Sequence, residues 1–339
     1  MIDVTDFGIA PNGEKVQLYT LKNEKGMTAK ITNYGGILTS LLIPVSGKNR
    51  EVVLGFDDLD EYTNTEYISN CPYFGALIGR YGNRINKGKF RIGDKDFQLN
   101  CNLGDHHLHG GLEGFDKKIW KAEILSDFEL KLSYTSPDGE ENFPGKLAVD
   151  VIYTLTNENE LQIKYQAVTD QTTPINLTQH SYFNLSEQPK DILDHQLKIN
   201  TDYILETDDS LIPGGQLLEV ENTVFDFRTK KTIQQDIEEL ENYDDCFAFK
   251  ESTKEPRKVA ELTDEKDTLT MEIHTTFPGL QLYSGKYIDA GKMKKFGPFA
   301  GVAIEAQGYP DAPNHPNFKH GWLHPGEIYK QQTNYRFIF

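Results

Sequence analysis

Near the carboxyl end of the chain a single acidic residue, Glu305, stands in the otherwise small and apolar run Gly301–Gln307. This run predicts a buried β-strand, with its even-numbered residues on one face and its odd-numbered residues on the other. A buried carboxylate is unfavourable unless it is paired or reactive, and burial raises its pKa towards that of a usable general base. On the same face Gly301 and Ala303 are small, which leaves room for a ligand beside Glu305. The alternative is a structural carboxylate satisfied by backbone amides or an arginine.

A second candidate is His180, in the middle of the polar segment 176–184. If this segment is a strand, one face carries Asn176, Thr178, His180, Tyr182 and Asn184. A solvated face normally carries Lys and Glu, so this mixture of donors, acceptors and one titratable ring is typical of a polar cleft. Histidine is the side chain best suited to give and take a proton near pH 7. The alternative is a buried polar network that fixes the register of the sheet.

Three further histidines, His106, His107 and His109, precede the pair Gly110-Gly111. In an extended stretch His107 and His109 share a face, and this spacing could hold a metal. Two histidines are too few, however, and no carboxylate follows at close spacing, so we predict no metal site. The glycine pair predicts instead that something approaches His109 closely. A histidine held only for packing is the alternative.

Residues that suit a sugar recur in three more segments: 79–85, 243–247 and 279–283. They contain Arg, Asn, Asp and Gln, which form paired hydrogen bonds with vicinal hydroxyls. Together with aromatic faces, such residues are the usual lining of a sugar site. Each segment alone is a weak signal, because these combinations are also common at the ends of strands.

The elements that must position these residues are mostly strands. Short alternating or apolar runs, separated by turn residues such as Pro213-Gly214-Gly215, predict strands at 28–33, 36–43, 52–55, 148–156, 161–168, 268–273, 279–284 and 335–339. Only Thr232–Tyr243 has helical spacing, and it is short. We predict an all-β fold, a large antiparallel β-sandwich with few short helices, as a single domain over residues 1–339. Two sandwiches of about 170 residues each also fit the length.

Composition limits the possible partners. The formal net charge of −17 argues against nucleic acid and anionic lipid, which both need basic patches. It also argues against a strongly anionic substrate, unless a local basic pocket overrides it. The longest apolar runs are too short to span a bilayer, and the first residues lack the pattern of a signal peptide. The three cysteines are scattered without metal-binding spacing. We therefore expect a cytoplasmic protein that does not bind membranes.

Taken together, the motifs resemble those of aldose 1-epimerases, the galactose mutarotases, along nearly the whole chain. The similar segments are Asn33–Gly36, Gly79–Ile85, Leu108–Gly111, Gly114–Lys117 with Trp120, Ser136–Glu140, Asn176–Leu185, Phe225–Arg228, Phe277–Gln281, Glu305–Gln307, Tyr309–Ala312 and Leu323–Glu327. The resemblance implies one large β-sandwich of the galactose mutarotase type, with a sugar cleft on a concave sheet face. It implies no cofactor, a free aldohexose as substrate, and a monomer or homodimer.

Site residues carry over by position. The general base of the family falls on Glu305 and its general acid on His180. His109 matches a second active-site histidine, which hydrogen bonds the sugar near its ring oxygen. Asp244 matches an aspartate that holds sugar hydroxyls, and further substrate contacts of the family match Arg84 with Asn83, and Gln281.

The sequence departs from the usual family pattern at His106, Asp245 and Asn142, where Asn, His and Gly are frequent. None of these departures removes a catalytic group, so they bear on substrate range rather than on activity. The implied reaction, mutarotation, needs one base and one acid, and no metal or redox group.

Other readings stay open at this point. A glycoside hydrolase would need two carboxylates, and Asp244 with Glu305 could be that pair. A non-catalytic sugar-binding sandwich would not need both His180 and Glu305. A hexose-6-phosphate epimerase would need clustered basic residues at the cleft, which the sequence does not locate. A maltose-preferring epimerase is the nearest rival.

Overall fold

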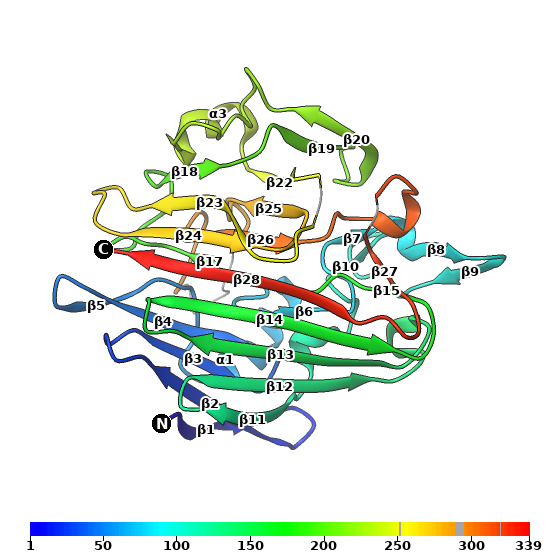
Figure 1. Ribbon diagram of the computed structural model, residues 1–339, viewed down its shortest axis with the longest axis horizontal. Helices are drawn as coiled ribbons and strands as arrows, with labels where there is room; N and C mark the ends of the chain where they lie inside the picture. Colours follow the sequence, from blue (N-terminus) through cyan, green and yellow to red (C-terminus); the bar gives the residue numbers. More distant parts are fainter. Residues whose placement is uncertain (251, 289–294, 319) are drawn as a thin grey trace.

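A computed structural model describes residues 1–250, 252–288, 295–318 and 320–339 (Figure 1). Its strand ladders are antiparallel and form three large sheets of nine, six and five strands and four further two-stranded pairs. The described α-helices are short: α1 (Asp60–Thr63), α2 (Thr65–Asn70) and α3 (Ile237–Leu240). The predicted all-β class with few short helices is therefore confirmed. No described helix is both long enough and apolar enough to cross a bilayer.

The strands of each sheet come from distant parts of the chain. In spatial order, the nine-stranded sheet contains β11 (Lys121–Ser126), β12 (Glu129–Ser136), β13 (Leu147–Leu155), β14 (Glu160–Thr169), β28 (Tyr329–Ile338), β24 (Thr270–Thr275), β23 (Arg257–Thr263), β18 (Gln196–Ile199) and β21 (Lys231–Thr232). The six-stranded sheet contains β17 (Tyr182–Phe183), β26 (Val302–Gln307), β25 (Gly279–Tyr283), β22 (Asp244–Ala248), β19 (Tyr203–Thr207) and β20 (Pro213–Glu219). The five-stranded sheet runs through β1 (Asp3–Ile9), β2 (Lys15–Lys22), β3 (Thr28–Thr32), β4 (Leu38–Val45) and β5 (Lys48–Glu51).

Shorter elements connect these sheets. The two-stranded pairs are β7 (Arg84–Ile85) with β10 (His107–Leu108), β6 (Leu77–Ile78) with β16 (Thr178–Gln179), β15 (Thr173–Pro174) with β27 (Trp322–Leu323), and β8 (Lys89–Ile92) with β9 (Lys95–Gln98). The described single-turn 3₁₀ helices are η1 (Asn86–Gly88), η2 (Phe115–Lys117), η3 (Glu140–Asn142), η4 (Ile233–Asp236) and η6 (Ala312–Asn314).

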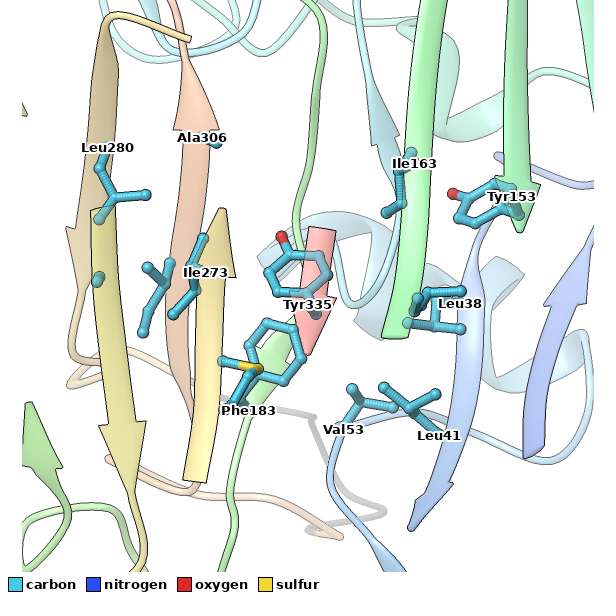
Figure 2. Packing of buried hydrophobic residues seen from close by; sticks show 14 of the residues in the cluster. Leu38, Leu41, Val53, Tyr153, Ile163, Phe183, Ile273, Leu280, Ala306 and Tyr335 are labelled. Atoms are coloured by element: carbon cyan, nitrogen blue, oxygen red, sulfur yellow. The ribbon is translucent and has the colours of Figure 1, made fainter. Parts of the chain in front are cut away.

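One apolar cluster lies between the sheets and makes the structure a sandwich. Along β13 every second residue is buried, as expected for a strand with one face on a core. Figure 2 shows Tyr335 and Ile163 of the nine-stranded sheet in one cluster with Leu280 of the six-stranded sheet and Leu38 of the five-stranded sheet. The core therefore holds all three large sheets together and fixes the strands that carry the site.

Most predicted strands exist, but their ends differ. The strand expected from residue 36 begins at Leu38, because Gly35 and Gly36 have φ of +61° and +57° and form a turn. The strand expected from residue 335 begins at Tyr329. Residues 52–55 are not a strand, since only Val53 forms a bridge, to Phe183. The predicted helix over residues 232–243 is divided between η4 and α3.

The segment 176–184 is not one continuous strand, contrary to the prediction. β16 pairs with β6, whereas β17 pairs with β26 in the six-stranded sheet. The chain therefore passes from one sheet to another, and His180 and Ser181 lie at the crossing between them. This break frees the backbone to place the His180 side chain beside β26.

Candidate active site

A cavity of about 180 Å³ lies on the face of the six-stranded sheet that points away from the core. All seven residues predicted for the site line it: Glu305, His180, His109, Asp244, Arg84, Asn83 and Gln281. The described lining also includes Asn70, Cys71, Pro72, Tyr73, Leu108, Tyr182, Tyr283, Tyr287 and Ile288. The structure thus brings together side chains that are separated by more than two hundred residues in the sequence.

Strand register explains why three of these side chains meet. On β26, Val302, Ile304 and Ala306 pack in the core, so Glu305 points to the cavity, as the alternation predicts. Gln281 of β25 lies directly opposite Glu305, and Asp244 of β22 follows on the next strand. Neighbouring strands therefore present polar groups side by side.

Glu305 and His180 form a close pair at the buried end of the cavity. The Oε1 atom of Glu305 lies 3.5 Å from Nε2 of His180. Both side chains are buried, with exposed fractions of 2% and 4%. Among the described residues no backbone amide or arginine hydrogen bonds Glu305, and its Oε2 atom has no partner. The alternative of a carboxylate satisfied by amides or an arginine therefore finds no support here.

Burial changes the proton affinity of both groups. It raises the pKa of Glu305 well above its ordinary value, and the nearby charge of Asp244 adds to this effect. Burial also lowers the pKa of His180 to about 4, because the charged ring loses its hydration. When the pair holds one proton, burial therefore favours placing it on the carboxyl group.

His109 also lines the cavity and follows directly after β10. Its Nδ1 atom accepts a hydrogen bond from the backbone N–H of Asn83 at 3.1 Å. The neutral ring therefore carries its proton on Nε2, which leaves that N–H free to donate to a ligand. Burial, helped by His180 and Arg84, lowers the pKa of His109 well below its ordinary value and keeps the ring neutral.

A hydrogen-bonded chain of polar groups forms another wall. Nε2 of Gln281 donates to Asp244 at 2.7 Å, and Nη2 of Arg84 lies 3.4 Å from the other carboxylate oxygen. The side-chain oxygen of Asn83 accepts from the backbone N–H of Arg84 at 2.8 Å. Because these groups fix one another, they present donors and acceptors in a set geometry suited to adjacent hydroxyls.

The structure bears on two expectations about small residues. The space beside Gly301 is filled by the protein, since a Cβ there would lie 2.9 Å from Leu54 and 3.0 Å from Tyr182. At Gly110 a Cβ would lie 1.8 Å from the carbonyl oxygen of Gly79. The protein backbone therefore approaches Gly110 closely, and the close approach of a ligand to His109 stays a prediction.

The segment 176–184 combines its two predicted roles. His180 and Tyr182 line the cavity. Asn176, Thr178 and Asn184 instead donate to the backbone carbonyls of Gly82, Ala306 and Ala300 at 2.9, 2.9 and 2.8 Å. These three side chains hold separate segments together, so the buried-network alternative is correct for them.

The other two predicted histidines lie outside the cavity lining. Nδ1 of His107 lies 2.7 Å from the carbonyl oxygen of Asn100, and its ring packs edge-on against Phe143. Nδ1 of His106 accepts from the backbone N–H of Lys87 at 3.2 Å. Within the described ranges no three His, Cys, Asp or Glu side chains gather closely enough to hold a metal. The absence of a metal site stays a prediction.

Sequence reasoning missed Tyr73 and Tyr287. The Tyr73 ring lies 4.8 Å from the ring of His109 and 5.7 Å from that of His180. The Tyr287 side chain is 72% exposed at the cavity mouth. No motif or periodicity separates these two from the other tyrosines, of which the chain has 17 in all.

Comparisons with known proteins agree with this geometry. A family model described as aldose 1-epimerase matches residues 17–336. A galactose mutarotase of Bos taurus is 39% identical over 348 residues, with 99% of each chain covered. An aldose 1-epimerase of Haemophilus influenzae is 37% identical, covering 99% of this chain and 100% of that one.

Solved structures give the same result. An aldose epimerase homologue from C. elegans superimposes with a TM-score of 0.87 at 30% identity, covering 95% of this chain and 98% of that one. A galactose 1-epimerase from Lactobacillus acidophilus also reaches 0.87, at 28% identity, with 100% and 98% covered. The assignment of residues 1–339 to one domain stays a prediction. Since the sequence matches extend over almost the whole chain, this protein belongs to the aldose 1-epimerase family and is an isomerase.

Proposed function

We propose that this isomerase interconverts the α and β anomers of free D-galactose or D-glucose, with Glu305 as general base and His180 as general acid. The observation that carries the proposal is the buried carboxyl–imidazole pair, 3.5 Å apart at the closed end of a cavity. A base and an acid in contact with one reacting centre suit the transfer of two protons in a single step.

The reaction balances with these two groups alone. Glu305 takes the proton of the anomeric hydroxyl while the bond between C1 and the ring oxygen breaks. The electrons of that bond go to the ring oxygen, which takes a proton from His180. The C1–C2 bond of the open aldehyde then rotates, and the reverse transfers close the ring on the other face. Opening of the sugar ring converts the ionised Glu305 and protonated His180 into a neutral carboxyl group and a neutral imidazole. Burial favours this neutral state of the pair.

The remaining groups suit sugar binding. The free Nε2–H of His109 can donate to the ring oxygen region, and Asp244, Arg84, Asn83 and Gln281 can hold hydroxyls. The cavity of about 180 Å³ has room for a small ligand such as a single sugar ring. Among the described lining residues Arg84 is the only permanent cation, and it faces Asp244. This favours a neutral sugar over a phosphorylated one.

The rival readings are less well supported. In a glycoside hydrolase Asp244 would be the second carboxylate, but here both of its oxygens face Gln281 and Arg84, as suits a hydroxyl-binding group. A non-catalytic binding module gives no reason to bury Glu305 against His180. A maltose-preferring epimerase differs only in substrate, and the exposed Tyr287 in the cavity lining offers an aromatic face on which a second sugar ring could pack.

Polarimetry of freshly dissolved α-D-galactose, α-D-glucose and maltose tests the proposal. We expect Glu305→Gln and His180→Asn each to slow mutarotation by about 10²–10⁴-fold, because each removes one proton-transfer group. His109→Asn should weaken both substrate binding and rate. Because no metal is needed, prolonged chelator treatment and dialysis should leave the rate unchanged.

The control is Glu219→Gln, an exposed glutamate on the edge strand β20 of the same sheet, which should behave as wild type. Near-normal turnover by Glu305→Gln would refute its role as base. Release of new reducing ends from an oligosaccharide would favour the hydrolase, and binding without any anomeric interconversion would favour the non-catalytic module.

A further inference from the structure

The ring of His180 lacks the usual hydrogen bond that orients a histidine in acid–base chemistry. Such a ring usually bonds a carbonyl or carboxylate through the nitrogen that does not face the substrate. Here Nε2 faces Glu305, and the buried Nδ1 atom has no hydrogen-bond partner in another described residue. The backbone of His180 itself raises the pKa of the ring, but burial outweighs this effect. Further contacts are therefore needed to hold the ring and to stabilise its charged form.

Aromatic rings surround His180 in place of that bond. The ring of Tyr182 lies 5.0 Å from it at an interplanar angle of 37°, and the ring of Tyr73 lies 5.7 Å away at 30°. The His109 ring completes the group, 5.2 Å away and nearly perpendicular at 79°. Both tyrosine rings are therefore tilted against the plane of the imidazole, within the distance at which an aromatic face attracts a cation, whereas the His109 ring stands nearly perpendicular to it.

The two tyrosines are themselves held in place. Tyr182 is 2% exposed, is paired with Ala303 through β17 and β26, and meets the ring of Phe74 at 5.3 Å. Tyr73 has a φ of +58°, a backbone conformation that non-glycine residues rarely adopt and that clusters at functional sites. The surrounding fold therefore fixes both rings rather than leaving them to follow His180.

We infer that Tyr73 and Tyr182 are positioning residues that hold the His180 ring and stabilise its protonated form through their aromatic faces. A cation within about 6 Å of an aromatic centroid is attracted by the negative face of the ring. The other groups facing the imidazole are the Glu305 carboxyl group and the neutral His109. The inference rests on the proposed role of His180 as general acid.

Leucine substitution of each tyrosine tests the inference, because leucine keeps apolar volume but has no aromatic face. We expect Tyr73→Leu and Tyr182→Leu each to lower kcat by about three- to thirty-fold, with little change in KM. Loss of the aromatic face makes the imidazolium less stable, so the acid limb of the pH profile should move to lower pH. Tyr73→Phe and Tyr182→Phe keep the aromatic face, so their acid limb should stay at the wild-type pH and their kcat should fall less than that of the leucine variants.

The matched control is Phe56→Leu, since Phe56 lies in the same aromatic cluster as Tyr182 but has no ring contact with His180. It should lower stability without moving the acid limb. If Tyr182→Leu does not fold, Tyr73→Leu decides, because Tyr73 is less buried. The inference would be overturned if the leucine variants changed KM alone or left the acid limb in place. It would also be overturned if the phenylalanine variants lost as much kcat as the leucine variants. Wild-type activity in His180→Asn would instead refute the role of His180 itself.

Discussion

At the scale of single residues, the proton count of the Glu305–His180 pair governs the dependence of the rate on pH. The proposed working state holds one proton on the pair, and the two groups titrate together. Burial lowers the pKa of His180 to about 4, so a second proton binds only near that pH. Burial raises the pKa of Glu305, so the single proton is lost only well above the usual carboxyl range.

We therefore expect kcat/KM to be flat around neutral pH, to fall near pH 4 as the second proton binds, and to fall again in the alkaline range. Polarimetry corrected for spontaneous mutarotation at each pH measures this profile. An acid limb near 6.5, the ordinary pKa of histidine, would show that His180 is not desolvated during turnover. A profile without limbs would contradict the acid–base pair.

The sequence predicts a site residue best when its chemical type is unfavourable in the surroundings that the local pattern predicts. Glu305 was visible because a carboxylate in a buried strand needs an explanation. The residues alone gave only weak signals for four others, and the resemblance to a family supplied their roles: Asp244, Arg84, Asn83 and Gln281. Tyr73 was not visible at all, because a tyrosine is unremarkable in a β-rich chain and its position depends on an unusual backbone angle.

At the scale of elements, the turn after β10 depends on glycine for two separate reasons. Gly110 has a φ of +92°, and a Cβ there would also overlap the carbonyl oxygen of Gly79, at 1.8 Å. We expect Gly110→Ala to lower the free energy of unfolding by at least about 3 kcal/mol, because the clash with backbone adds to the strain of the positive φ. Since the turn follows His109 directly, activity should fall as well. Urea unfolding measures the change in stability.

Gly13→Ala is the control for the backbone angle alone. Gly13 has a φ of +87°, but a Cβ there would meet nothing within 4 Å. Its substitution should cost only about 1–2 kcal/mol. Equal losses in the two variants would show that the approach of Gly79 contributes nothing to the requirement for glycine.

Strands were predicted correctly where their own sequence alternates between buried and exposed residues. They were not predicted where they form only because of the strands with which they pair. β13 and β14 are long strands with one buried face, so their sequences show the alternation clearly. β16 and β17 have two residues each and exist because β6 and β26 lie beside them. No local signal could show that the chain changes sheets between them, yet this crossing positions His180.

At the scale of the whole molecule, β28 joins two parts of the nine-stranded sheet. It pairs with β14 on one side and with β24 on the other. The edge strand β11 pairs only with β12 within this sheet. We expect the amides of β28, β14 and β24 to exchange with solvent at one common slow rate, because freeing any of them disrupts the whole sheet.

Native-state hydrogen exchange followed by mass spectrometry of the corresponding peptides measures these rates. Peptides from β11 and from the β8–β9 hairpin should exchange faster, since they can open locally. If β28 exchanged faster than β14, its central place would not make it a cooperative part of the sheet.

The central place of β28 also affects how the protein is made. On the ribosome β14 emerges while residues 170–328 are still to be added, and β28 follows only after them. At a synthesis rate of roughly 5–20 residues per second, this delay lasts about ten to thirty seconds. For that time the edge of β14 has no permanent partner, and an open strand edge is a template for incorrect pairing. Until β28 has been made, nascent chains of this protein are therefore exposed to aggregation and to chaperones that bind strand edges.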